Sequence, residues 1–164
     1  MVQASRPRAP RGFTLIEILV VCAIIAILLG LAMVRLDHSE SNRLNSAAEA
    51  MTRLLEAARD ESVIRGQPLA FSSDGEGYQF WFSDANRNEW IAQPSTDTIA
   101  ARKFPEGIVL SSMRINGLSR PLGERIVFSL SGMTEPFALT LTCGSSRLEI
   151  LADALGRMEI QRAQ

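Results

Sequence analysis

The fold of this chain is decided by Arg11-Gly12-Phe13-Thr14-Leu15-Ile16-Glu17, the stretch that opens an apolar run ending at Val34. The run contains one charged side chain, that of Glu17. A helix over residues 13–34 would be about 33 Å long at ~1.5 Å per residue, which matches a hydrocarbon core of about 30 Å. We therefore expect one membrane-spanning helix at 13–34, with the rest of the chain anchored by it.

The leader in front of the run, residues 1–12, is basic: it holds Arg6, Arg8 and Arg11 and no acid. Basic residues beside a span favour the cytoplasmic side, so we expect a cytoplasmic amino terminus and an exported remainder. A cleaved secretory signal peptide is the alternative. It is disfavoured because the run exceeds the usual ~7–15 apolar residues, lacks an A-x-A site at its end and carries an acid. An acid at the centre of a spanning helix costs roughly 2.5–3.5 kcal/mol, so Glu17 should have a partner.

The junction at residues 11–17 resembles the class III signal of type IV pilins and pseudopilins. In that family a basic leader ends in Gly, an N-methylated residue (usually Phe) follows, and Glu stands at the fifth mature position. Gly12, Phe13 and Glu17 match all three. The resemblance implies a prepilin peptidase that cuts between Gly12 and Phe13 and methylates the new amine. It also implies that Glu17 pairs with the Phe13 amine of the next subunit in a helical filament.

The apolar period continues beyond the span and predicts one long helix over residues 13–65. One face of it is apolar and the others are polar, as expected of a helix that covers a core. Gly66 suits the position after the helix and Pro68 cannot continue it, so we expect the helix to end there. The apolar face consists of Leu44, Ala47, Ala48, Met51, Leu54, Leu55 and Ala58.

Beyond Gly66 the alternation of apolar and polar residues predicts short strands in an antiparallel meander. Residues 93–107 are poorly patterned and predict an irregular loop or edge. The strand faces that we expect are Leu69 and Phe71; Tyr78, Phe80 and Phe82; a strand beginning at Trp90; Ile126, Phe128 and Leu130; Phe137, Leu139, Leu141 and Cys143; Leu148 and Ile150; Met158 and Ile160. The predicted class is α+β: a long N-terminal helix, half in the membrane, packed on a small antiparallel β-sheet or β-sandwich domain at 66–164.

The carboxy-terminal part resembles the globular domain of the H-type minor pseudopilins (GspH) and of the related FimT-type minor pilins. The resemblance is carried by residues 128–132, 135–139 and 155–158. It implies a structural subunit rather than an enzyme, in the pseudopilus of a bacterial type II secretion system. The implied partners are other minor pseudopilins, the major pseudopilin, the prepilin peptidase and the inner-membrane assembly platform. The implied location is the bacterial inner membrane, with the carboxy-terminal domain in the periplasm.

A type IV pilus minor pilin of the FimT kind, acting in pilus assembly or DNA uptake, is the second candidate. That kind is associated with DNA binding through a C-terminal Gly-Arg-x-Arg element. Here Gly156 and Arg157 are followed by Glu159, an acid that weakens attraction to phosphates. The aromatic residues Tyr78, Phe80 and Phe82 are expected in the core rather than stacked on bases. We therefore expect no nucleic-acid binding.

No catalytic, metal or cofactor site is expected. Cys22 and Cys143 lie in different environments and are interpreted as small apolar side chains, and His38 has no second histidine to share a metal with. Residues 84–89 open like a calcium loop, but Glu89 stands where an EF-hand needs Gly, so a polar turn is expected. The serines lack a G-x-S-x-G motif. A membrane-anchored periplasmic enzyme is therefore the weakest candidate.

Overall fold

The computed structural model describes residues 15–84, 87–93 and 99–162, without the side chains of 30–39. The chain divides into two compact units, Met1–Leu36 and Asp37–Gln164. One helix, α1 (Leu15–Arg65), runs through the boundary, and all strands belong to the second unit. The predicted α+β class is confirmed.

The helix ends where the sequence predicts. Gly66 has a φ of +62°, and its N–H donates to the Val63 carbonyl at 3.3 Å, while the Gln67 N–H donates to the Ser62 carbonyl at 3.1 Å. These two bonds form a Schellman motif, which satisfies carbonyls that the helix leaves unpaired. A Gly suits this position because its φ is positive.

The predicted membrane span, 13–34, lies partly outside the described residues: 13 and 14, and the side chains of 30–34. Within the part of the chain that the structure describes, no helix is both long enough and apolar enough to cross a membrane.

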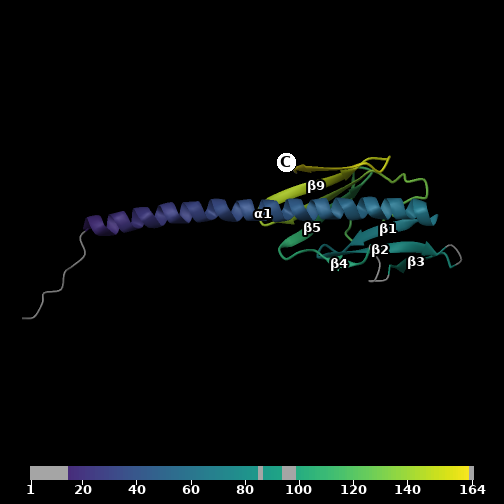
Figure 1. The fold of residues 1–164 in the computed structure, drawn as a ribbon, viewed down its shortest axis with the longest axis horizontal. Helices are drawn as coiled ribbons and strands as arrows, with labels where there is room; N and C mark the ends of the chain where they lie inside the picture. The colour runs from purple at the N-terminus through teal and green to yellow at the C-terminus, as the bar shows by residue number, and fades with distance from the viewer. Residues whose placement is uncertain (1–14, 85–86, 94–98, 163–164) are drawn as a thin grey trace, which may run out of the picture. The chain divides into compact units, whose positions relative to one another are not determined.

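The strands form two antiparallel sheets rather than one meander (Figure 1). The first sheet has the order β3-β2-β1-β7, with β4 paired to β2, and the second has the order β10-β9-β8-β5-β6. The bounds in the first sheet are β1 Leu69–Ser73, β2 Gly77–Asp84, β3 Glu89–Ala92, β4 Arg102–Lys103 and β7 Ile126–Phe128. The bounds in the second are β5 Ile108–Ile115, β6 Leu118–Arg120, β8 Phe137–Cys143, β9 Ser146–Ala152 and β10 Met158–Arg162.

The core lies between the apolar face of α1 and both sheets. Leu44, Ala48, Met51, Leu55 and Ala58 are buried, as the helical period predicts, and they belong to one cluster with residues of both sheets. From the first sheet this cluster takes Leu69, Phe71, Phe80, Ile126 and Phe128, and from the second it takes Ile108, Leu110, Met113, Leu139, Leu141 and Ile150. Packing against α1 therefore holds the two sheets together.

Two expectations about the strands were wrong. Leu130 does not extend the face of β7: the strand ends at Phe128, and Leu130 is 49% exposed because the chain turns at Gly132, whose φ is +75°. The chain after β6 does not start a continuous meander, since β7 crosses to the first sheet and pairs with β1. The stretch 93–107, expected to be a loop or an irregular edge, contains in its described part only the two-residue strand β4, which pairs with β2.

The hairpin β5–β6 was not predicted at all. The alternation of apolar and polar residues in β5 is interrupted by a register shift between Leu110 and Ser112. The apolar residues therefore do not keep a period of two along this strand. A local signal was present, however. Asn116-Gly117 joins the strands with φ values of 54° and 76°, as Asn-Gly commonly does in tight hairpins.

Candidate assembly site

Glu17 lies in the first turn of α1, on an exposed stretch of helix. No hydrogen bond or ion pair joins its carboxylate to another described residue. Gly12 and Phe13, the other two predicted site residues, lie outside the described residues. The structure therefore places Glu17 but does not bring it together with the other two.

The helix around Glu17 is apolar on every side. Its large hydrophobic side chains are between 46% and 85% exposed within this chain. A helix that is apolar all round belongs in a membrane or among other helices, and soluble monomers rarely expose so large an apolar patch. This surface is suited to lipid or to the helices of other subunits. It consists of Leu15, Ile16, Ile18, Leu19, Val20, Val21, Ile24, Ile25, Ile27, Leu28 and Leu29.

The apolar surroundings restrict the states in which the Glu17 carboxylate is stable. An ionised acid in hydrocarbon is unfavourable unless it is near the interface or paired with a cation. Residues 15–29, the part of the first unit whose side chains the structure describes, contain no Lys, Arg or His. Among residues 15–29, whose side chains are described, Glu17 therefore has no cation to pair with.

In the second unit, polar contacts fasten the last turns of α1 to the strand connections. The Arg59 guanidinium donates to the Gly156 carbonyl at 2.6 Å, and Arg59 also pairs with Asp60 at 2.7 Å. The Ser62 hydroxyl is buried and lies 3.1 Å from the Ser129 carbonyl oxygen and 2.6 Å from that of Arg59. These contacts join the end of α1 to the β7–β8 and β9–β10 connections.

The carboxy-terminal corner bears on the nucleic-acid alternative. Asp153 accepts from the backbone N–H of Arg157 at 3.0 Å, from the Arg157 side chain at 2.8 Å and from the Leu155 N–H at 2.9 Å. The backbone N–H of Arg157, chiefly, holds the pKa of the Asp153 carboxyl below its usual value. Arg157 is therefore already paired with an acid, which weakens its attraction for a phosphate.

The aromatic residues of β2 are largely accounted for by packing. Phe80 is fully buried against Phe71, with ring centroids 5.6 Å apart, and Tyr78 packs on Phe104 at 5.4 Å. Burial raises the pKa of the Tyr78 hydroxyl, and the nearby charge of Arg102 partly opposes this. The prediction of a core role is confirmed for Phe80, whereas Tyr78 and Phe82 are only half-buried.

The remaining predicted groups have structural surroundings. Cys143 is buried in the core, as expected, and Cys22 is exposed on α1; neither forms a disulfide. The Ser129 hydroxyl lies 2.8 Å from that of Ser131 and 2.7 Å from the Met133 carbonyl oxygen, inside the turn that follows β7. The side chain of His38 lies outside those described. Among the described residues, no three His, Cys, Asp or Glu side chains are grouped as metal ligands.

Sequence reasoning missed the contacts that fasten α1 and one surface feature. The contacts of Arg59 and Ser62 were not predicted, because their acceptors are backbone carbonyl oxygens, which no residue type reveals. Arg125 lies over the ring of Trp81 at 4.4 Å and near that of Trp90 at 5.9 Å, a cation–π arrangement on the first sheet. The two tryptophans are evident in the sequence, but their shared cation is not.

Comparison with known proteins identifies the family. Residues 47–156 match the family described as Type II transport protein GspH, and residues 7–33 match the prokaryotic N-terminal methylation motif. The type II secretion system protein H of Pseudomonas aeruginosa is 35% identical over 85 residues, which are 51% of this chain and 49% of that protein. This chain thus matches about half the length of that curated relative.

Two solved structures have a similar fold. The minor pseudopilin EpsH of Vibrio cholerae aligns with a TM-score of 0.61 at 15% identity, over 73% of this chain and 96% of that one. The type IV minor pilin FimU of Pseudomonas aeruginosa aligns with a TM-score of 0.53 at 14% identity, over 76% and 92%. At these identities the likeness shows the fold alone. The family match covers more than half of the sequence, and this chain therefore belongs to the GspH family of type II transport proteins.

Proposed function

We propose that this protein is a minor pseudopilin, a structural subunit of the type II secretion pseudopilus that drives export of folded proteins across the outer membrane. The observation that carries the proposal is membership of the GspH family. The apolar helix surface around Glu17 supports it, because such a surface fits a subunit that moves from lipid into a bundle of helices. A structural role needs no cofactor and no catalytic group.

The proposed topology is a single pass through the bacterial inner membrane at 13–34, with the amino terminus cytoplasmic and the β-domain periplasmic. Arg6, Arg8 and Arg11 support this orientation, because positive residues are retained in the cytoplasm. The match of residues 7–33 to the methylation motif supports an N-terminal anchor of the prepilin kind.

The proposed maturation is cleavage between Gly12 and Phe13 by a prepilin peptidase, followed by methylation of the Phe13 amine. Gly12 suits the cleavage position because it has no side chain to obstruct entry of the backbone into a protease cleft. Removal of the leader takes away three arginines and no acid, so the formal charge changes from −1 to −4. The methylated amine keeps its positive charge and is left four residues before Glu17.

In the proposed assembly step, Glu17 pairs with the Phe13 amine of a neighbouring subunit. Before assembly the carboxylate is ~6 Å along the helix from Phe13 and can stay close to the membrane interface. In a helix bundle it loses hydration and needs the neighbouring cation. The proposed neighbours are other minor pseudopilins and the major pseudopilin, assembled on an inner-membrane platform.

The test of maturation is mass spectrometry of the chain co-expressed with a prepilin peptidase. We expect a chain twelve residues shorter that begins with N-methylated Phe13. Gly12→Leu should block the cut, because the larger side chain obstructs the cleft, and it provides the uncleaved reference. An intact Met1 in the presence of active peptidase, or a cut after Ala32, would contradict the assignment.

A minor pilin of a type IV pilus remains the second candidate, favoured by the fold shared with FimU. The phenotype of a strain that lacks the gene distinguishes the pseudopilin from the pilus subunit. A pseudopilin is required for secretion of folded proteins, whereas a pilus subunit is required for pilus display or DNA uptake. Loss of pili with normal secretion would favour the second candidate.

A further inference from the structure

Exposed apolar side chains gather at the end of the second unit where α1 ends. Val63 and Ile64 come from the last turn of the helix, Leu130 and Met133 from the β7–β8 connection, and Leu155 from the β9–β10 turn. Ile64 is 78% exposed and Leu155 61%, and the other three are each about half exposed. We name these five residues the apolar patch. None of them is needed for the core, which consists of other residues.

Specific contacts keep the three segments of the apolar patch together. The Ser62 hydroxyl lies 3.1 Å from the Ser129 carbonyl oxygen, beside the start of the β7–β8 connection. The Thr134 N–H donates to the Ala154 carbonyl at 3.4 Å, which joins that connection to the β9–β10 turn. A Cβ atom at Gly132 would lie 3.5 Å from a methyl group of Val63. The patch is therefore one surface built from distant parts of the chain.

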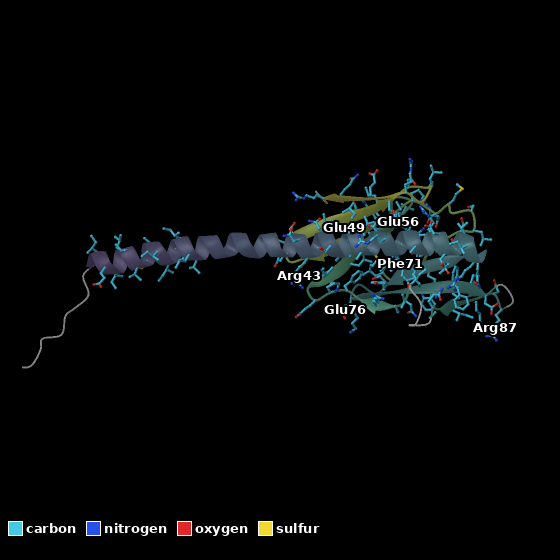
Figure 2. All side chains as sticks on the ribbon, in the orientation of Figure 1. Arg43, Glu49, Glu56, Phe71, Glu76 and Arg87 are labelled. Carbon is cyan, nitrogen blue, oxygen red and sulfur yellow. The ribbon has the colours of Figure 1, made fainter. Side chains whose placement is uncertain are left out.

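An apolar hollow lies at the other end of the same unit. There Ser46, Ala47 and Ala50 of α1 face Pro105 and Ile108 across a largely apolar hollow of ≈ 440 Å³. Arg43 donates to the Glu106 carbonyl oxygen and closes its side. Figure 2 shows Arg43 at the end of the domain opposite to the one where α1 ends. Residues 46 and 63 of the helix are ~26 Å apart at 1.5 Å per residue. We name this feature the entry hollow.

We propose that the apolar patch binds the entry end of the globular domain of another pseudopilin, the end at which that subunit's own helix enters its domain. This inference rests on the proposed function. Domains whose α1 segments run in the same direction share one orientation, so neighbours along a filament meet through opposite ends of their domains. Such head-to-tail contacts are heterologous and continue into open helical assemblies. The apolar patch and the entry hollow provide matching apolar surfaces for a contact of this kind.

The composition of the patch supports a protein partner. Contiguous exposed apolar surfaces on soluble domains mark interaction sites, whereas single scattered residues do not. Leu118 is such a scattered residue: it is 62% exposed at the start of β6, outside the patch. It has the same side chain as Leu155 and almost the same exposure, so it provides a matched control.

The first experiment compares full-length Leu155→Glu with full-length Leu118→Glu in cells that carry the secretion system and lack the chromosomal copy. Both variants should accumulate like the wild type, because both changed side chains are exposed. We expect Leu155→Glu to reduce secretion at least tenfold and Leu118→Glu to change it less than twofold. Equal secretion by the two variants, at equal protein level, would overturn the inference.

The second experiment identifies the occupant. A photoreactive amino acid placed at Met133, and in a separate strain at Leu118, is irradiated in the full-length protein, and cross-linked peptides are identified by mass spectrometry. From position 133 we expect cross-links to another pseudopilin, mapped to the first periplasmic turns of its helix or to the loop facing them. Cross-links to the secreted protein, or equal pseudopilin cross-links from both positions, would overturn the inference.

The deletion strain separates this inference from the proposed function. If the strain without the gene secretes normally, the pseudopilin assignment fails, and the inference fails with it. If that strain does not secrete but Leu155→Glu secretes like Leu118→Glu, the assignment stands and only the role of the apolar patch is wrong.

Discussion

Glu17 is the one charge in an otherwise apolar stretch, so its substitution separates insertion from assembly. Glu17→Ala removes an unfavourable charge from the membrane and should leave insertion and Gly12–Phe13 cleavage intact. If Glu17 pairs as proposed, the variant leaves the neighbour's amine unpaired in the assembled state, at a cost of about 3–5 kcal/mol, or roughly a hundredfold or more in association. Cysteine cross-linking to neighbouring pseudopilins measures the loss.

Glu17→Gln is the finer variant, because it keeps shape and hydrogen bonding but removes the charge. We expect it to cross-link and secrete poorly, close to Glu17→Ala. If both variants assemble and secrete like the wild type, the pairing role is wrong and Glu17 serves only in recognition of the leader.

Gly156 is a second position where one residue has a large predicted effect. A Cβ there would lie 2.7 Å from Arg59 Cδ and 2.9 Å from the Gly132 carbonyl oxygen, at a φ of +74°. Gly117 has a φ of +76°, and a Cβ there would meet no atom within 4 Å, so Gly117→Ala has the backbone strain without the clash. We expect Gly117→Ala to destabilise by about 1 kcal/mol and Gly156→Ala by about 2–4 kcal/mol. Thermal unfolding of the Asp37–Gln164 unit tests this, and equal losses would contradict the clash.

At the scale of elements, we expect the stability of the turn between β9 and β10 to depend on pH. The pKa of Asp153 lies below its ordinary value of 3.8, first because of the Arg157 backbone N–H. A lowered folded pKa means that the carboxylate stabilises the fold above the unfolded pKa and that this contribution is lost as pH falls through the folded pKa. We expect the stability difference between wild type and Asp153→Asn to be largest above about pH 5 and to shrink below about pH 4. Urea unfolding at several pH values measures it.

Arg157→Ala is the control for this turn. It removes the side-chain contact to Asp153 but keeps the backbone N–H, the largest cause of the shift. Most of the pH dependence should therefore remain in Arg157→Ala. Its complete loss would show that the side-chain pair, not the backbone of the turn, stabilises the carboxylate.

The helix α1 contacts both sheets and two of the connections between strands. Five buried apolar residues of α1 cover both sheets, while Arg59 and Ser62 join the end of the helix to two connections. Without α1 the two sheets would lose the surface that holds them over a common core. The part of the helix within the Asp37–Gln164 unit therefore organises the β-domain.

At the scale of the whole molecule, the net charge bears on whether the protein binds DNA, and so on the choice between a secretion subunit and a DNA-uptake pilin. The mature chain would have a formal charge of −4, and Arg157 is already paired with Asp153. We expect the Asp37–Gln164 unit to give no band shift with duplex DNA at micromolar protein, even at low salt. Micromolar binding that weakens steeply with salt and is abolished by Arg157→Ala would favour the DNA-uptake alternative, because phosphate contacts release counterions.

The sequence alone determined the local features of this protein. The basic leader, Gly12, Phe13 and Glu17 are recognised as a linear motif, and the buried face of α1 follows from a helical period that needs no knowledge of its partners. The end of the helix at Arg65 was likewise predicted, because Gly66 favours the positive φ that the cap requires. Strands β8, β9 and β10 were also predicted from the sequence, because apolar and polar residues alternate along them.

Only the tertiary structure decided how the strands are shared between two sheets. β7 pairs with β1 and β5 with β8, although other strands lie between them in the sequence, and such long-range pairings leave no local pattern in the sequence. The shift between Leu110 and Ser112 hid β5, and the end of β7 left Leu130 exposed. The fastening of α1 and the apolar patch depend on carbonyl oxygens and side chains from distant segments, which become neighbours only when the core packs.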